Sequence, residues 1–262
     1  MKFATDINNL EQLAASQWGM FTTSQAQKHG IQRNQIARLA KKNKAEPLSY
    51  GVYRMTAGEE TAAADIKAAW MSVYPQFFVA ERMKRRPYDA VVAGRTAAVL
   101  HNLGDFYASP YTFIVPTRKQ SSRGEIKYLP WVLDNKDVVF ADGLPTTSLE
   151  RTIADLVHLR EEPSYVDGVI SEAAQKELKI DSGRLAELLA PLASRNGYKK
   201  NDGGAFSRDL LARNYAEIQL ERAGNRFSQA LDLVEGQEPI EVVYEFIRIP
   251  ALEGGSESMH EG

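Results

Sequence analysis

The side chains best suited to chemistry lie between residues 32 and 44, where arginine, lysine and amide side chains recur at close spacing. Arg33 can pair bidentately with guanine, and Asn34 and Gln35 can pair with adenine. Arg38 and the lysines that follow it are better placed to meet phosphate oxygens. These residue types in this order predict contacts with the base edges and the backbone of a nucleic acid.

Such a side-chain set needs a helix that presents it and neighbouring elements that hold that helix. The pattern predicts a helix over about residues 33–42, with Ile36, Leu39 and Ala40 on its apolar face in continuation of Ile31. Gly30 supplies the turn before it. The alternation over residues 47–55 is typical of a small hairpin, the wing of a winged helix-turn-helix.

Two more helices are predicted before this turn. The first is capped by Asn8 or Asn9 and runs to Trp18, where Gly19 ends it. The second is capped by one of two threonines, with a glutamine at the return position of a capping box; the candidates are Thr22, Thr23, Gln25 and Gln27.

The predicted DNA contacts come from the second helix, the third helix and the hairpin: Thr22, Thr23, Gln32, Arg33, Asn34, Gln35, Arg38, Lys41, Lys42, Lys44, Tyr50 and Arg54. The two threonines and nearby backbone amides can hold a phosphate. Lys44 and Arg54 flank the wing and can reach the DNA backbone or a minor groove. Tyr50 or Tyr53 of the wing can offer an aromatic ring for stacking. The alternative is a solvated basic face on an ordinary helical bundle.

Charge is unevenly distributed along the chain. Residues 1–55 carry eight lysines and arginines against three acids, whereas the remainder carries 24 bases and 31 acids. The whole chain has a formal net charge of −2, which by itself would not suggest a nucleic-acid partner. A basic N-terminal region ahead of an acidic remainder predicts a polyanion contact at one end and a different partner at the other.

After residue 58 the pattern mixes helices and strands. Helices are expected at 59–74, 95–101, 146–160 (capped by Thr147 or Ser148), 164–178, 182–194 and 206–224, and strands at 111–115, 126–133, 137–140 and 240–249. Asp142-Gly143 reads as a turn and Gly203-Gly204 as a hinge or loop.

We therefore expect an α+β protein, with an N-terminal winged helix-turn-helix followed by a mixed α/β domain that has a helical C-terminal part. The predicted boundaries are 1–57 for the DNA-binding domain and 58–250 for the second domain, with an α/β core at 58–160 and a mainly helical part at 161–250. Residues 251–262 have the composition of a flexible tail.

Several segments of the chain resemble those of a known family, the abortive-infection AbiEi antitoxins. The resemblance is carried by residues 17–26, the helix of residues 33–39 and the hairpin segment 50–55. It continues in the same order through 69–70, 95–105, 112–116 and 143–156, and covers about residues 10–160.

The resemblance implies an antitoxin of a type IV toxin–antitoxin pair. Such proteins oppose a nucleotidyltransferase-like toxin without forming a stable complex with it. Their winged helix represses the shared operon by binding inverted repeats in the upstream double-stranded DNA, and the C-terminal domain carries the antitoxin activity. We expect a protein without catalytic activity, and the absence of cysteine fits a cytoplasmic location.

Two other functions remain open. The first is a stand-alone winged-helix regulator without a toxin partner. The second is a metal-dependent nuclease that uses Asp105, Glu125 and Lys127, because Glu125-Ile126-Lys127 matches a Glu-x-Lys pattern. Side chains two apart on a strand point the same way, so this pattern is also that of a solvated strand face.

A second basic surface is expected from two polar segments after the winged helix. Its residues are Lys84, Arg85, Arg86, Arg118, Lys119 and Arg123, and it would serve either DNA binding or the antitoxin activity. The alternative is a pair of ordinary solvated loops.

The sequence offers no support for other classes of site. It has no cysteine, and its four histidines stand far apart without metal-ligand spacing, so no metal and no cofactor are expected. Hydrophobic residues make up 44% and charged residues 25%, and no apolar run is long enough for a membrane span.

Overall fold

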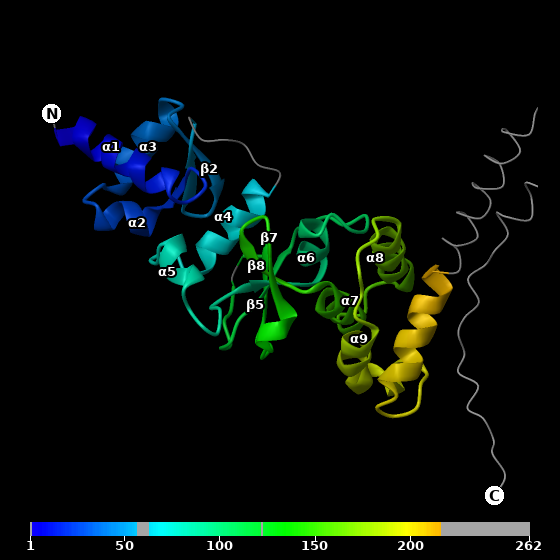
Figure 1. The fold of residues 1–262 in the computed structure, drawn as a ribbon. Coiled ribbons are helices and arrows are strands. Elements are labelled where there is room, and N and C mark those ends of the chain that lie inside the picture. The colour runs from blue at the N-terminus through cyan, green and yellow to red at the C-terminus, as the bar shows by residue number, and fades with distance from the viewer. Residues whose placement is uncertain (1, 57–62, 122, 216–262) are drawn as a thin grey trace, which may run out of the picture. The chain divides into compact units, whose positions relative to one another are not determined.

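The computed structural model describes residues 2–56, 63–121 and 123–215, and the chain divides into one compact unit at Met1–Leu211 and a second from Ala212 onward. The fold is mixed α and β, as predicted (Figure 1). We call residues 2–56 the head and residues 63–211 the body. In the described part of the chain, no helix is both long and apolar enough to cross a membrane.

The head is a three-helix unit with a small sheet. Its helices are α1 (Lys2–Ala15), α2 (Thr23–Lys28) and α3 (Arg33–Lys41), and its strands are β1 (Met20–Thr22), β2 (Ala45–Ser49) and β3 (Val52–Met55). The sheet has the order β1-β3-β2, and both pairings are antiparallel. Its core contains the predicted Ile31, Ile36 and Leu39, whereas Ala40 is only half-buried. The buried core residues are Leu10, Ala14, Phe21, Ala26, Ile31, Ile36, Leu39, Ala45 and Met55.

Local chemistry explains the start of α2 and the turn before α3. Thr22 is the N-cap of α2, where its side chain accepts from the Gln25 amide and Gln25 Oε1 accepts from the Thr22 amide, so the capping box is confirmed. Gly30 has a φ of 79°, which a residue with a Cβ rarely adopts. The turn is therefore specified by its own residues.

The first helix differs from the prediction at both ends. It begins before Asn8 and ends at Ala15, and Trp18 takes a left-handed backbone conformation with a φ of 58°. The reason is that Trp18 packs on the body, edge to face against Trp70 at 6.1 Å between ring centroids. Strand β1, which follows at once, was not predicted from its three residues.

The body contains a five-stranded mixed sheet. Its strands are β4 (Val91–Val92), β5 (Tyr111–Ile114), β6 (Ile126–Leu129), β7 (Val138–Ala141) and β8 (Leu144–Thr147), in the order β6-β5-β4-β8-β7. Two pairs are parallel, β5 with β6 and β4 with β8, and the other two are antiparallel. Asp142 and Gly143 form the predicted turn between β7 and β8, with φ values of 52° and 77°.

Helices cover this sheet and extend the body beyond it. They are α4 (Ala64–Val73), α5 (Val79–Met83), α6 (Gly94–Leu100), α7 (Leu149–His158), α8 (Pro163–Gln175) and α9 (Ser182–Leu189). Three short 3₁₀ helices lie at Asn135–Asp137, Ala190–Leu192 and Ser194–Asn196, and residues 203–215 are helical. Figure 1 shows α7, α8 and α9 grouped beside the sheet.

Several predicted elements of the body have different bounds; the helices predicted at 164–178 and 182–194 end earlier, at Gln175 and Leu189. Thr146 and Thr147 belong to strand β8 rather than to a helix, and Ser148 is the N-cap of α7 through a hydrogen bond from the Arg151 amide. The strand predicted at 126–133 ends at Leu129, where its pairing with β5 ends. The remainder of the helix predicted at 206–224, the strand predicted at 240–249, the end of the second domain and the tail at 251–262 lie outside the described residues.

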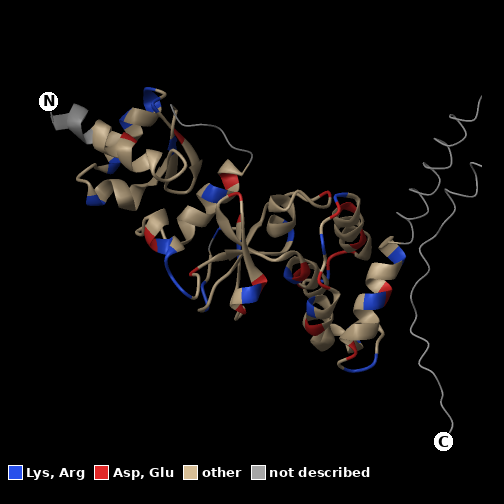
Figure 2. Cartoon of the chain, viewed as in Figure 1, with Lys and Arg blue, Asp and Glu red and all other residues tan. Residues whose placement is uncertain are grey.

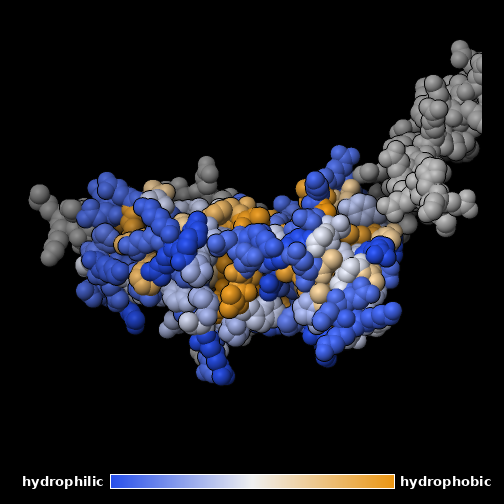
Figure 3. All heavy atoms as spheres, turned by 60° about the horizontal axis from the view of Figure 1, so that its bottom comes forward, coloured by the Kyte–Doolittle hydropathy of each residue, from blue (hydrophilic) through white to orange (hydrophobic). Residues whose placement is uncertain are grey.

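Apolar side chains also reach the surface beside β7, an edge strand of the sheet. Val132 is 89% exposed and Phe140 is 56% exposed, and a cavity of about 60 Å³ lined by Trp131 and Leu133 lies in the same region. Figure 3 shows apolar residues gathered on one face over the middle of the described chain.

The Gly203-Gly204 pair is part of a helix, not the predicted hinge or loop. A Cβ on Gly203 would lie 2.0 Å from the Ala186 carbonyl oxygen and 2.6 Å from the Ala190 amide nitrogen. Glycine is needed here because the helix starts in direct contact with the backbone of α9.

Gly203→Ala is expected to lower the free energy of unfolding by about 3 kcal/mol or more, because two backbone segments must separate. Gly204→Ala is the matched control. Its Cβ would meet nothing nearer than Asp202 Oδ1 at 3.9 Å. Urea unfolding of the two variants measures the difference, and equal midpoints would contradict the close approach.

Asp155, on α7, is a buried carboxylate in an ionic cluster. Its Oδ1 accepts from Arg151 Nε at 2.6 Å, whereas its Oδ2 has no hydrogen bond within the described residues. Burial, together with the nearby charge of Asp137, raises the pKa of Asp155 to about 7 against the opposing effect of Arg151.

The folded protein therefore keeps a proton on Asp155 at pH values where the unfolded chain, with an ordinary pKa near 3.8, has released it. The free energy of unfolding is expected to gain a contribution as the pH falls from about 7 toward about 5, and to lose it as the pH rises again. Asp155→Asn should remove this contribution. Urea unfolding across this range tests the prediction, and parallel pH profiles for the two proteins would refute it.

Candidate nucleic-acid interface

Helix α3 presents the predicted DNA-reading side chains on its solvent face. Arg33, Asn34, Arg38, Lys41 and Lys42 are exposed. Ile36 and Leu39, on the opposite face, are buried at 1% exposure each. Figure 2 shows lysine and arginine gathered on α3 and the turn after it, whereas the body shows both signs of charge mixed.

The two glutamines at the start of α3 have different roles from those predicted. Gln32 is the exposed N-cap residue, and its amide donates to Gln35 Oε1 at 2.7 Å. Gln35 is half-buried and uses its side-chain oxygen in this contact. It therefore helps to fix the start of α3, and Asn34 is the more accessible amide.

The predicted phosphate contact at the start of α2 is not available to DNA at Thr22. Thr22 is fully buried, and its hydroxyl donates to the Pro75 carbonyl oxygen at 2.5 Å. Thr23 is half-buried and donates through both its amide and its hydroxyl to the Gly51 carbonyl oxygen, at 2.8 and 3.3 Å. The start of α2 is committed to contacts within the protein.

The wing presents one strongly exposed aromatic side chain. Tyr50 is 80% exposed at the hairpin tip, whereas Tyr53 stacks on Phe21 with 5.6 Å between ring centroids. Lys44 is exposed before the hairpin. Arg54 is 11% exposed and forms an ion pair with Glu46 at 2.7 Å, so its charge is balanced within the wing.

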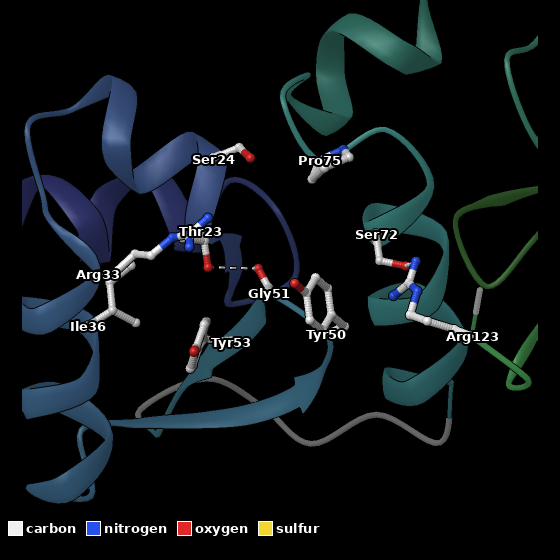
Figure 4. A pocket seen from close by; sticks show the side chains of 10 residues that line it. All are labelled: Thr23, Ser24, Arg33, Ile36, Tyr50, Gly51, Tyr53, Ser72, Pro75 and Arg123. Atoms are coloured by element: carbon white, nitrogen blue, oxygen red, sulfur yellow. Dashed lines mark hydrogen bonds between the residues drawn. The ribbon is translucent and has the colours of Figure 1, made fainter. Parts of the chain in front are cut away.

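A groove of about 610 Å³ lies beside the start of α3 and the wing (Figure 4). Its lining comes from α2, α3, the wing and the body: Thr23, Ser24, Arg33, Ile36, Tyr50, Gly51, Tyr53, Ser72, Pro75 and Arg123. Figure 4 shows the head residues on one side and Ser72, Pro75 and Arg123 on the other.

The comparisons agree with this N-terminal geometry. Residues 8–56 match the model of a family described as transcriptional regulators of the AbiEi antitoxin type. The N-terminal region is similar to AbiEi antitoxin regulators. The resemblance predicted from the sequence is confirmed for this region, which we call the AbiEi-type head.

One solved structure is similar to most of the chain. It is the crystal structure of the RV2827C protein from Mycobacterium tuberculosis, which shares 16% sequence identity over 81% of each chain, with a TM-score of 0.48. The comparison with curated proteins found no match.

The AbiEi-type head is fixed to the body by a buried pair of glutamines. The side chains of Gln17 and Gln25 exchange two hydrogen bonds at 3.0 and 3.1 Å. Gln25 Nε2 also donates to the Phe77 carbonyl oxygen at 2.8 Å, and Gln17 Oε1 accepts from the Val79 amide at 3.1 Å. The sequence predicted Gln25 only as a capping residue and gave no role to Gln17. The reason is that their partners, Phe77 and Val79, lie far from both glutamines along the chain.

Apolar packing joins the same two parts. Met20 and Val52 of the AbiEi-type head lie in one buried cluster with Trp70 and Ala69 of α4 and with Val92 of the body sheet. The groove walls formed by the head and the body therefore belong to one packed unit.

The six residues predicted as a second basic surface do not all offer free charge. Arg85 contacts Asp89 at 3.4 Å and stacks on Phe77, and Arg86 lies 4.0 Å from the ring centroid of Tyr88. Lys84 and Arg118 are exposed.

The loop that carries Arg118 also sends two cations toward α4. Lys119 Nζ donates to the Val73 carbonyl oxygen at 2.5 Å and lies 4.0 Å from the Tyr74 ring centroid. Burial lowers the pKa of Lys119. Arg123 reaches Ser72 and lines the groove.

The residues of the nuclease alternative do not form a metal site. In the described ranges, no group of three or more histidine, cysteine, aspartate or glutamate side chains could hold a metal ion. Asp105, Glu125 and Lys127 are exposed, and Glu125 Oε1 lies 3.6 Å from Arg123 and accepts from Ser49 at 3.5 Å. Glu125 and Lys127 follow the solvated-strand pattern.

Proposed function

We propose that this protein is an antitoxin that also represses its own operon. Repression uses the exposed face of α3 in the major groove, with the wing against the flanking backbone. The observation that carries the proposal is the AbiEi-type head, in which buried Ile36 and Leu39 hold Arg33, Asn34, Arg38 and Lys41 in the solvent.

The finer features of the proposal follow the family resemblance. The pair is of type IV, the toxin is nucleotidyltransferase-like, and the body opposes it without a stable complex and without catalysis of its own. The protein acts in the cytoplasm on inverted repeats in its own promoter. Of the predicted contacts, we keep Asn34, Arg33, Arg38, Lys41, Lys42, Lys44 and Tyr50, and we leave out Thr22 because it is buried.

A gel-shift titration against the DNA upstream of the gene tests the repressor activity. A scrambled duplex is the control, and a salt series measures the number of phosphate contacts. Selective binding to the upstream DNA is expected. Binding without preference over the scrambled duplex would reject autoregulation. Co-expression with the toxin encoded beside it then tests antitoxin activity, and failure of rescue would favour the stand-alone regulator.

Two single substitutions separate base reading from phosphate binding. Arg33→Ala is expected to weaken binding to the operator by about 1–3 kcal/mol and to relax base preference, because it removes a contact with a base edge. Lys41→Ala is expected to weaken binding to operator and scrambled duplexes alike and to lower the salt slope by about 1. Equal losses on both duplexes for Arg33→Ala would contradict its role as a base reader.

A further inference from the structure

The groove beside α3 has a wall that belongs to the body, and its chemistry is that of a phosphate contact. Arg123 lies on this wall, 25% exposed. Its Nη2 donates to Ser72 Oγ at 3.3 Å, while its Nη1 is buried and makes no hydrogen bond within the described residues. A guanidinium with an unused donor favours an anionic oxygen as its partner.

The one anion beside Arg123 among the described residues holds it weakly. Glu125 Oε1 lies 3.6 Å from Nη1, beyond hydrogen-bond distance, and the Glu125 side chain is 44% exposed. An exposed ion pair of this kind contributes little. A phosphate that displaces Glu125 therefore gives up little ion pairing, and the guanidinium must turn for its buried Nη1 to meet the phosphate.

The groove opens onto the elements that we propose to read DNA. Arg33, the first residue of α3, lines it, and so do Tyr50 and Tyr53 of the wing. The Tyr50 ring centroid lies 5.5 Å from Arg123 Cζ, so the wing tip and the body meet at this point. A DNA strand whose bases face α3 would carry its backbone past Arg123.

We propose that Arg123 is a DNA-backbone contact and that the groove seats a sugar–phosphate strand between the head and the body. This inference rests on the proposed function and adds that the body takes part in DNA binding. The head and the body then bind DNA as one unit, held together by the hydrogen bonds of Gln25 to the Phe77 carbonyl oxygen and of the Val79 amide to Gln17.

Fluorescence anisotropy of the full chain with labelled operator and scrambled duplexes, over a salt series, tests this proposal. Arg123→Gln is expected to weaken binding to both duplexes by about fivefold near physiological salt and to lower the salt slope by about 1. Arg118→Gln is the matched control, because it removes the same charge from the same loop at an exposed residue outside the groove lining. It should change affinity by less than about twofold.

Glu125→Gln should act in the opposite direction and tighten binding several-fold, because it removes the anion that competes with phosphate for Arg123. This gain should disappear in the Arg123→Gln background. Because the Glu125 side chain is 44% exposed, Glu125→Gln is expected to fold, and it tests the proposal if thermal melting shows that Arg123→Gln is unfolded.

Equal affinities and salt slopes for Arg123→Gln and Arg118→Gln would overturn the groove contact. If the wild-type protein binds the operator and Lys41→Ala weakens it in that same experiment, the proposed function stands and only this inference fails. If the wild-type protein binds neither duplex, both fail.

Discussion

Replacing Asp89 with alanine is expected to lower the free energy of unfolding by about 3–5 kcal/mol, because it leaves a buried charge without its partner. Asp89 accepts three hydrogen bonds from Arg82, at 2.9 to 3.1 Å. Arg82 is 1% exposed, lies 3.3 Å from the Trp70 ring centroid and donates to the Trp70 carbonyl oxygen. Burial lowers the pKa of Arg82, while Asp89 favours the charged form.

Urea unfolding followed by tryptophan fluorescence measures this loss, and the exposed Asp105→Ala is the control for removal of a carboxylate. A second variant separates the effect of the unpaired charge from the effect of lost packing. Arg82→Met combined with Asp89→Ala should be less destabilised than Asp89→Ala alone, because no charge then stays buried. A double variant that is less stable than the single one would show that packing, rather than the unpaired charge, accounts for the loss.

Neutralising the exposed cations of α3 should have the largest effect on DNA binding. Arg38 and Lys41 of α3 and Lys42, its C-cap residue, are all exposed. Their replacement by alanine is expected to weaken binding about 100-fold near physiological salt and to lower the salt slope by about 3, since each phosphate contact releases one counterion. Anisotropy titrations on the operator over a salt series measure both quantities.

The matched control removes three exposed lysines from the body, Lys179, Lys199 and Lys200, and has the same change in net charge. It should leave the salt slope unchanged and alter affinity only slightly. If the control loses as much affinity as the α3 variant, the binding depends on overall charge rather than on a helix in the groove.

The elements that sequence reasoning predicted well are those specified by their own residues. Helix α3 follows from the spacing of Ile36 and Leu39 and from the turn at Gly30. The start of α2 follows from the Thr22–Gln25 capping box. Short strands without such signals were missed, because β1 and β8 form through pairing with β3, β4 and β7 rather than through local preference.

The contacts between the head and the body could not be read from the sequence, because their partners lie far apart along the chain. Thr22 bonds to the backbone of Pro75, 53 residues away, and this contact removes it from the DNA-facing set. The Gly203-Gly204 pair is typical of a loop, yet glycine is required at residue 203 because the backbone of Ala186 and Ala190 lies against it. Long-range contacts of this kind depend on tertiary packing rather than on local propensity.

The sequence by itself determined helix α3, its cationic face and the resemblance of residues 8–56 to AbiEi antitoxin regulators, because periodicity, caps and motif order are local properties. The tertiary structure alone decided which of those side chains are free to meet DNA. Burial of Thr22 and pairing of Arg54 with Glu46 withdraw two of them, whereas the packing of the body against the wing brings Arg123 to the groove. The physical reason is that exposure and charge balance depend on which distant groups fold against a residue.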